Sequence, residues 1–157
     1  MSETHRINSQ LKRAYQGEAW HGPSLRELLD GVTAAQAAAR PIANAHSIWE
    51  LVNHIIAWEQ IVRQRLEGET LNEIPNEMNF PPVSDNGEDA WQATLRALEA
   101  SNQALRNSIK QMGQAGDAKL EETVPGMAYT NYFMLHGAIQ HDLYHAGQIA
   151  LLKKMVA

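Results

Sequence analysis

Apolar residues recur at intervals of three and four along most of the chain, and no segment shows sustained alternation of apolar and polar residues. The first pattern is typical of helices that bury one face, whereas alternation would indicate strands. The clearest case starts near Gly87, where a 4-3-4-3 spacing is typical of the seam between packed helices. Its apolar members are Trp91, Leu95, Leu98, Leu105, Ile109 and Met112, with Asn102 in the one gap. The chain is therefore expected to be all-α.

Capping signals and loop residues divide the 157 residues into four substantial helices. The expected helices run from about Thr4 to Gln16, from the Ser47–Glu50 capping box to about Leu66, from near Gly87 to about Met112, and from about Thr130 to the carboxyl end. Shorter helices should follow two further boxes, Ser24–Glu27 and Thr33–Gln36. A single domain, residues 1–157, folded as a four-helix bundle fits this pattern.

Two long connections affect the expected order of the helices. One joins the first and second long helices; the other, residues 68–87, joins the second and third. Each is long enough to cross the length of a bundle, so an up-down-up-down order is not required. Loops as long as 68–87 usually serve as a lid or a crossover.

Composition excludes several classes of function. The charged residues, 13 Lys and Arg against 18 Asp and Glu, give a formal charge of −5 and argue against a nucleic-acid partner. No run of about 18 apolar residues predicts a membrane span, and without a secretory signal the cytoplasm is the expected location. The chain has no cysteine. Disulfides, thiolate metal sites and a protein thiol nucleophile are therefore excluded, and any metal must bind histidine, carboxylate or other oxygen ligands.

The last helix carries His141 and His145 at positions i and i+4, so both rings lie on one face. Two imidazoles so placed can bind one metal ion, as in the HExxH motif of zinc proteases. Here Asp142 follows the first histidine and lies about 100° from the histidine stripe, a poor match to that motif's general base. The protease interpretation is rejected on this ground. The alternative is a pair of core histidines that only form hydrogen bonds.

His54, on the second long helix, favours the metal interpretation because it supplies a third inward imidazole. Three histidines with one open position are typical of a catalytic metal site. Gln148, one turn after His145, is placed to orient a ligand or a bound water. Glu59 lies within the apolar stripe of its helix and is either a general base or a structural acceptor. The second role is favoured because Glu59 lies about 140° around the helix from His54.

The other histidines carry weaker predictions. His5 and His46 are expected to have no special role, and His136 is about 140° from His141, out of reach of the same ion. His21, in a loop with an aromatic residue and a glycine, is a weak candidate for lining a pocket. Asn102 either points at the site or fixes the register of its helix.

Three segments of the sequence resemble the DinB-like (YfiT-like) superfamily of bacterial four-helix-bundle proteins. They are AWHGPSL at 19–25, HSIWELVNHIIAWE at 46–59 and HGAIQHDLYHAGQIALLKK at 136–154. The resemblance implies an up-down-down-up bundle, usually homodimeric, with one divalent metal ion on His54, His141 and His145. Nickel, zinc and iron all occur in that family, so the metal is not specified.

Characterised members of that family include transferases and isomerases that use bacillithiol, mycothiol or glutathione. No motif here selects a thiol or a substrate, so the family does not settle the reaction. The first hypothesis is a metal-dependent transferase that activates an external low-molecular-weight thiol for attack on an electrophile. A metal-dependent hydrolase would use the same site. A metal-binding or stress-related protein without turnover is a further alternative, and so is an all-α dimer whose histidines are only core residues. A fourth protein ligand would favour the non-enzymatic role, and an open coordination position would favour the enzyme.

Overall fold

The computed structural model describes residues 1–157, and its regular structure is entirely helical. Four long helices form the bundle: α1 (Glu3–Tyr15), α4 (Ile48–Leu66), α6 (Glu88–Gln114) and α7 (Asn131–Val156). The shorter helices are α2 (Leu25–Leu29), α3 (Ala34–Ala38), α5 (Asn76–Asn79) and the 3₁₀ helix η1 (Asp117–Glu121). The predicted all-α bundle is confirmed, whereas α5 and η1 were not predicted. No helix combines the length and apolarity needed to cross a membrane.

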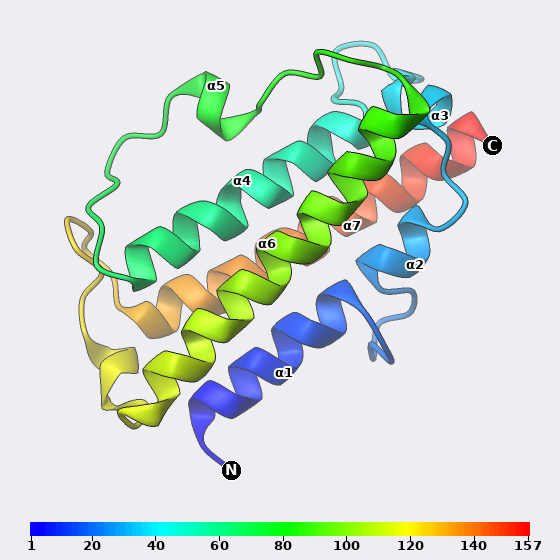
Figure 1. The fold of residues 1–157 in the computed structure, drawn as a ribbon. Coiled ribbons are helices and arrows are strands. Elements are labelled where there is room, and N and C mark those ends of the chain that lie inside the picture. The colour runs from blue at the N-terminus through cyan, green and yellow to red at the C-terminus, as the bar shows by residue number, and fades with distance from the viewer.

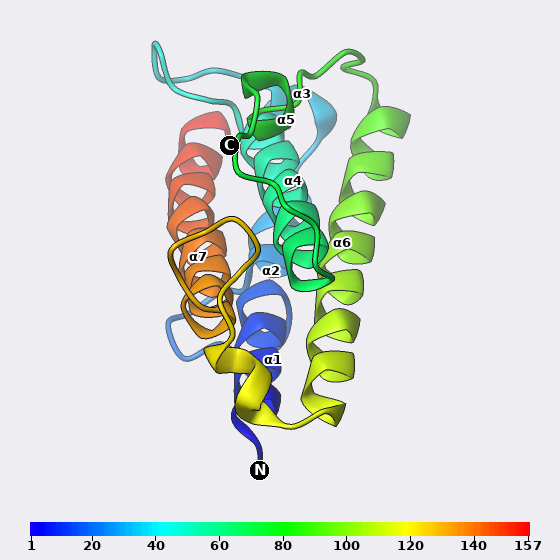
Figure 2. The same cartoon turned by 90° about the vertical axis from the view of Figure 1, so that its left-hand side faces the viewer.

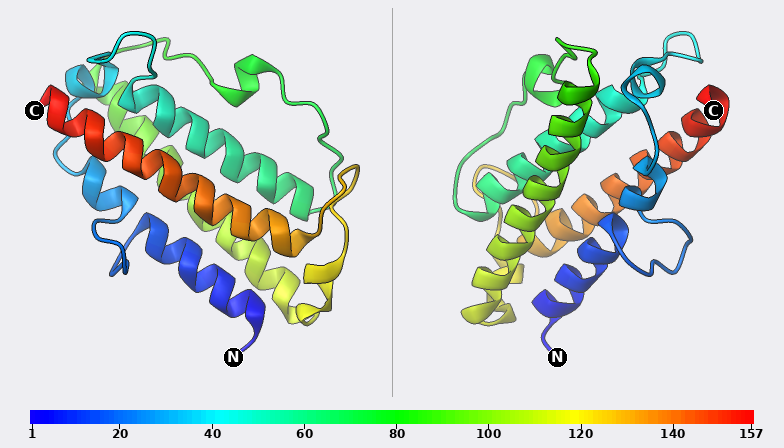
Figure 3. Two further views of the ribbon diagram at one scale, coloured as in Figure 1. Left: turned by 180° about the vertical axis from the view of Figure 1, so that it is seen from behind. Right: turned by 45° about the vertical axis from the view of Figure 1, so that its right-hand side comes forward.

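The long helices follow the up-down-down-up order. Helices α1 and α7 run in one direction and α4 and α6 in the other (Figure 1). Helix α4 packs against both α6 and α7, and α1 packs against the same two helices. Seen from behind, α7 lies between α4 and α1 (Figure 3, left). The neighbours α4 and α7 are therefore antiparallel, which decides which of their residues face each other.

Local hydrogen bonds set where the site-bearing helices begin. Ser47 Oγ accepts the N–H of Glu50 at 3.2 Å, and Glu50 Oε2 accepts the N–H of Ser47 at 2.7 Å, which confirms the predicted capping box of α4. Thr130 Oγ1 accepts the N–H of Phe133 at 3.3 Å and caps α7. With both starts set, the register of the histidines along α4 and α7 is also set.

The connection 67–87 is a crossover. Because α4 and α6 are parallel, the chain must return along the whole length of the bundle between them. Figure 2 shows this connection running over α4, with the 115–130 connection beside it over α7. The two connections touch at Gly126, whose φ of 75° and missing side chain admit a close approach: a Cβ there would lie 2.1 Å from Asn72 Oδ1. Together they cover one face of the α4–α7 pair.

The core consists of two apolar clusters along the bundle axis. One joins α2, α3, the first half of α4, the start of α6 and the end of α7. The other joins α1, the end of α6 and the start of α7. Between them the buried residues are polar on three helices: Glu59 on α4, Ser101 and Asn102 on α6, and Asp142 on α7. We call these four residues the polar layer. A buried polar layer is costly, which makes this level of the bundle a candidate functional region.

Candidate metal centre

Helices α4 and α7 bring three imidazoles together beside the polar layer. One ring nitrogen from each of His54, His141 and His145 lies within 4.8 Å of the others. Nε2 of His54 is 3.0 Å from Nε2 of His141. Two imidazole nitrogens bound to one tetrahedral ion at 2.0–2.1 Å would lie about 3.3 Å apart. The distance between His54 and His141 is close to this value, and no carboxylate belongs to this cluster.

Hydrogen bonds orient two of the three rings. His54 Nδ1 lies 2.5 Å from the carbonyl oxygen of Asn79, and His145 Nδ1 lies 2.6 Å from Oε1 of Gln148. Both acceptors require the imidazole to donate from Nδ1, so the lone pair of each ring is left on Nε2. Bonds of this kind hold metal-binding histidines in one tautomer and orientation. Gln148 thus contacts the ring of His145, and its predicted role in orienting a ligand or a bound water stays a prediction.

The rings are held in the neutral form that binds a cation. The pKa of His54 is lowered to about 4 by burial and by repulsion from His141, His145 and His46, against a hydrogen bond to the Asn79 carbonyl that raises it. Burial also lowers the pKa of His141 to about 4. The pKa of His145 is lowered, again chiefly by burial. Neutral imidazoles keep a free lone pair at neutral pH, so protons do not compete for these nitrogens there.

The crossover connection contributes side chains and backbone that sequence reasoning missed. The ring of Phe80 stacks between His46 and His54, with centroids 3.9 and 4.0 Å away and nearly parallel planes. Asn79, besides its bond to His54, accepts the indole N–H of Trp58 through Oδ1 at 2.8 Å. His46, for which no role was predicted, thus belongs to the support of the site. No sequence pattern connects residue 79 or 80 to α4, because the contact depends on the path of the loop.

Glu59 accepts hydrogen bonds from α6, the contact expected of the structural role that the sequence favoured, and its role stays a prediction. It is 2% exposed and accepts hydrogen bonds from Ser101 Oγ and, at 2.7 Å, from Asn102 Nδ2. Burial raises the pKa of Glu59 well above its usual range, and the nearby carboxylate of Asp142 raises it further. Asn102 accordingly points into the polar layer. Asp142 is 3% exposed, and burial raises its pKa as well.

The histidines open onto a cavity of about 430 Å³ between α4 and α7. This volume falls in the range of small-molecule sites. One end is formed by the three histidines with Asn79 and Tyr144, and the other end by Arg65, Tyr129 and Phe133. The walls between them are mainly apolar: Trp58, Val62, Met134, Gly137 and Ala138, with Glu59 and Asp142 of the polar layer behind. A mostly apolar cavity with a few polar groups at its ends is typical of a ligand site.

Comparison with known proteins places this geometry in a family. The sequence model described as the DinB superfamily matches residues 19–149, a span that holds all three histidines and both loops over them. The chain belongs to the DinB superfamily.

A solved structure agrees with the fold of this DinB-superfamily chain. The crystal structure of a conserved protein from Enterococcus faecalis superposes with a TM-score of 0.71, covering 99% of this chain and 98% of that one. The two sequences are 18% identical, so the likeness concerns the fold alone. No curated protein matches the sequence.

Two further histidine predictions concern residues away from the cluster. His21 is exposed and does not line the cavity, so its prediction as a pocket residue was wrong. The isolated turn around it, Ala19 to Gly22, leaves its aromatic neighbour Trp20 fully exposed as well. His136 packs against Tyr132 with ring centroids 4.4 Å apart and lies outside the cluster, as the helical angle predicted.

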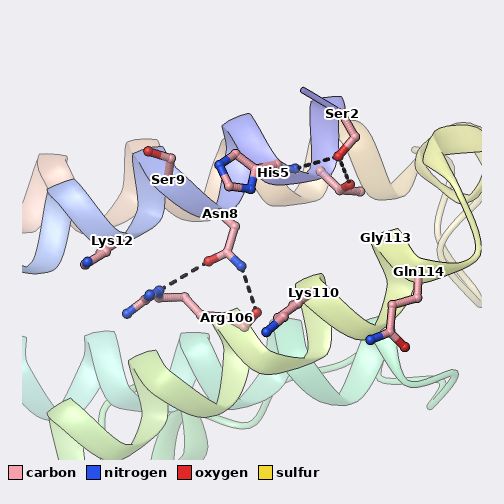
Figure 4. Close-up of a pocket in the computed structure, with 10 residues that line it drawn as sticks. Ser2, His5, Asn8, Ser9, Lys12, Arg106, Lys110, Gly113 and Gln114 are labelled. Atoms are coloured by element: carbon pink, nitrogen blue, oxygen red, sulfur yellow. Dashed lines mark hydrogen bonds between the residues drawn. The ribbon is translucent and has the colours of Figure 1, made fainter.

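The DinB-superfamily chain has a second cavity, of about 540 Å³, between α1 and α6, and it differs in chemistry. Figure 4 shows polar and basic side chains along it, with Arg106 bonded to Asn8 across the groove. None of its lining residues is hydrophobic, and it contains His5 but no cluster of metal ligands. The cavity between α4 and α7 is therefore the candidate site.

Proposed function

We propose that this protein binds one divalent cation through His54, His141 and His145 and acts as a transferase that joins an external low-molecular-weight thiol to an electrophile. The observation that carries the proposal is the convergence of three imidazoles, two buried and one half-buried, at one end of a cavity of small-molecule size. Membership of the DinB superfamily supports it.

The number of protein ligands supports a reactive site over a purely structural one. Structural zinc sites are closed by four protein ligands, whereas catalytic sites keep one position for a substrate or water. Here three histidines face the cavity, and the His141 side chain keeps 25% of its surface exposed. A cosubstrate therefore has access to the same place as the cation.

The residues around the histidines prepare the site for this chemistry. Asn79 and Gln148 hold the Nδ1–H groups of His54 and His145, which leaves the Nε2 lone pairs of these two rings for a ligand. Phe80 covers His54, and Trp58 and Met134 limit the water that reaches the histidines. A bound divalent cation supplies Lewis acidity, which lowers the pKa of a thiol or water molecule that reaches it.

The thiol in this proposal comes from outside the protein, because the chain has no cysteine. The mainly apolar walls of the cavity suit a molecule with an uncharged body. Nickel, zinc and iron all remain part of the proposal, since three imidazoles bind each of them.

The metal proposal is tested by elemental analysis of protein purified without a histidine tag. We expect about one divalent ion per chain. His145→Ala should lose it, while His5→Ala should retain it, because His5 is exposed on α1 in the other cavity. Sub-stoichiometric metal together with no rise in melting temperature on adding metal would contradict the proposal, and so would equal loss in both variants.

Turnover is tested with a panel of thiols: bacillithiol, mycothiol, glutathione and coenzyme A. Each is mixed with a chromogenic electrophile and with metal-loaded or metal-stripped protein. Metal-dependent conjugation with at least one thiol is the expected result. If the panel is silent, the same preparations are tested on chromogenic esters. Activity there favours the hydrolase, and none favours metal binding without turnover.

We also propose that the chain forms a homodimer through α7. Four large apolar side chains on this helix are more than half exposed: Phe133, Tyr144, Leu151 and Met155. Surfaces of this kind often mark protein–protein contacts. Sedimentation analysis should give a dimer, and Leu151→Glu should shift it toward the monomer; a wild-type monomer would contradict the proposal.

A further inference from the structure

The far end of the candidate cavity contains a buried positive charge. Arg65 follows His54 by eleven residues, about three helical turns, so both side chains lie on the same side of α4. Arg65 is 5% exposed and lines the same cavity as the histidines. Since α7 runs antiparallel to α4, Arg65 lies near Phe133 and Met134 at the start of α7, while His54 faces His141 and His145.

The guanidinium of Arg65 has no counter-charge in the protein. Its Nε and Nη2 donate to the carbonyl oxygen of Leu71 at 3.1 and 2.5 Å, and its Nη1 donates to the hydroxyl of Tyr129 at 3.1 Å. No carboxylate oxygen lies within 4.0 Å of it, since it forms none of the ion pairs of the molecule. These bonds use three of the five N–H groups of an arginine, which leaves one on each terminal nitrogen.

The other arginines make this arrangement unusual. Four of them pair with glutamates, and their side chains are 34% to 65% exposed: Arg6, Arg26, Arg40 and Arg63. An exposed arginine has the least need of a carboxylate partner, because water solvates its charge. The most buried arginine has none. A buried, unpaired charge is costly, so a cavity wall that carries one is suited to an anion that enters the cavity.

Distances along the cavity limit the size of that anion. The indole ring of Trp58 lies between the two ends, with its centroid 5.7 Å from Cζ of Arg65 and 5.8 Å from the ring of His141. The guanidinium and this imidazole therefore lie at most about 12 Å apart. One small molecule can reach both ends and lay an apolar or aromatic body against Trp58.

We propose that Arg65 binds a carboxylate group of the substrate while the reacting end of the same molecule lies at the histidines. Two free N–H groups, one on each terminal nitrogen, match the two oxygens of a carboxylate. A phosphate dianion would require more donors than the apolar walls provide. The substrate class is thus a small monocarboxylic acid with an apolar body. The assignment of its reacting end depends on the proposed function; the binding of the carboxylate does not.

The experiment uses isothermal titration calorimetry on the full chain with 4-phenylbutanoate and its uncharged analogue 4-phenylbutanamide. Each is titrated into zinc-loaded and metal-stripped protein, so that coordination of the acid by the metal is separated from binding by Arg65. We expect the wild type to bind the acid about 10- to 100-fold more tightly than the amide in both preparations. Arg65→Met should abolish most of this preference.

Arg106→Met is the matched control, because Arg106 lines the other cavity and is bonded to Asn8 at 3.2 Å. It should keep the full preference for the acid. Arg65→Lys retains the charge without the planar fork and should keep part of it. Circular dichroism and urea unfolding check that each variant is folded, because Arg65 also holds the Leu71 carbonyl.

The wild type alone can refute the inference, even if the Arg65 variants do not fold. Equal affinity for acid and amide, or no binding of the acid up to about 5 mM, overturns it. A preference that survives in folded Arg65→Met overturns it too. Failure of the metal to bind, with the preference intact in stripped protein, instead refutes the proposed function and supports the carboxylate site.

Discussion

Replacing Glu59 by glutamine tests whether the polar layer holds a proton at neutral pH. Glu59 is 2% exposed, and burial raises its pKa well above the usual range of a carboxyl group, with a further contribution from Asp142. The folded protein therefore keeps a proton on this side chain to a higher pH than the unfolded chain does. The unfolded chain releases that proton above about pH 4.3.

A proton held only by the folded state makes the free energy of unfolding depend on pH. The stabilisation that this proton gives the folded state is complete below the pKa of Glu59 in the unfolded chain. It is lost as the pH rises toward the pKa of Glu59 in the folded protein. The loss is about 1.4 kcal/mol per pH unit for one proton. Glutamine carries no such proton. The stability of Glu59→Gln relative to the wild type should therefore increase with pH between about pH 5.5 and 7.5.

The substitution fits the local hydrogen bonds. The glutamine oxygen can accept the bond that Asn102 Nδ2 now donates at 2.7 Å. Its amide nitrogen can donate to Ser101 Oγ, whose hydroxyl already reaches the carbonyl oxygen of Leu98 at 3.0 Å. No buried polar group loses its partner, so the comparison measures the proton and not a broken bond.

Urea unfolding of metal-stripped protein, followed by circular dichroism at both pH values, measures the difference. The histidines of the candidate site have lowered pKa values and act in the opposite direction, but they are present in both chains and cancel. Glu121→Gln, at an exposed position, is the control and should show no pH-dependent difference. A difference between Glu59→Gln and wild type that is the same at both pH values would refute the reasoning.

Three further predictions concern the candidate metal centre and the core. Gln148→Leu removes the hydrogen-bond acceptor of the His145 imidazole and should weaken metal binding about 10- to 100-fold, measured in competition with a chromogenic chelator. Gln140→Leu, on the exposed side of α7, is the control and should not weaken metal binding. Burial lowers the pKa of His54 to about 4, so metal affinity measured by the same chelator competition should change little from about pH 7.5 to 6. A steep decline in affinity beginning near pH 6.5 would contradict this prediction. Trp91→Phe should cost about 1–3 kcal/mol in urea unfolding, because it leaves the Val32 carbonyl, now bonded at 2.7 Å, without its donor; an unchanged midpoint would contradict it.

Local sequence signals predicted most of the fold. The capping box at Ser47 and Glu50 marked the start of α4, and the seam from Trp91 to Met112 marked α6, because both signals depend only on residues within one helix. Helical periodicity predicted that His141 and His145 share one face of their helix and that His54 points inward. The structure brings these three side chains together. Their binding of a metal stays a prediction.

Local sequence signals do not predict contacts between segments that are distant in the sequence. Asp142 was set aside because it lies off the histidine stripe, yet α7 is buried on two sides and Asp142 faces the polar layer. Arg65 lies on the same side of α4 as His54, but its hydrogen bonds go to Leu71 and Tyr129 in the two long connections, which helical periodicity does not describe. Asn79 and Phe80 reach His54 through the path of the crossover, which periodicity does not describe.

The order of the helices explains why these unpredicted residues gather at one site. In an up-down-up-down bundle, short turns would join neighbouring helices and leave the outer side of α4 and α7 open. Here α4 and α6 are parallel, so residues 67–87 must return along the bundle, and they do so over α4 (Figure 2). On the way the chain supplies the Leu71 carbonyl to Arg65 at one end of the cavity, and Asn79 and Phe80 to His54 at the other. The crossover that the topology demands thus also forms part of both polar ends of the candidate site, and a change in its length should disturb the two ends together.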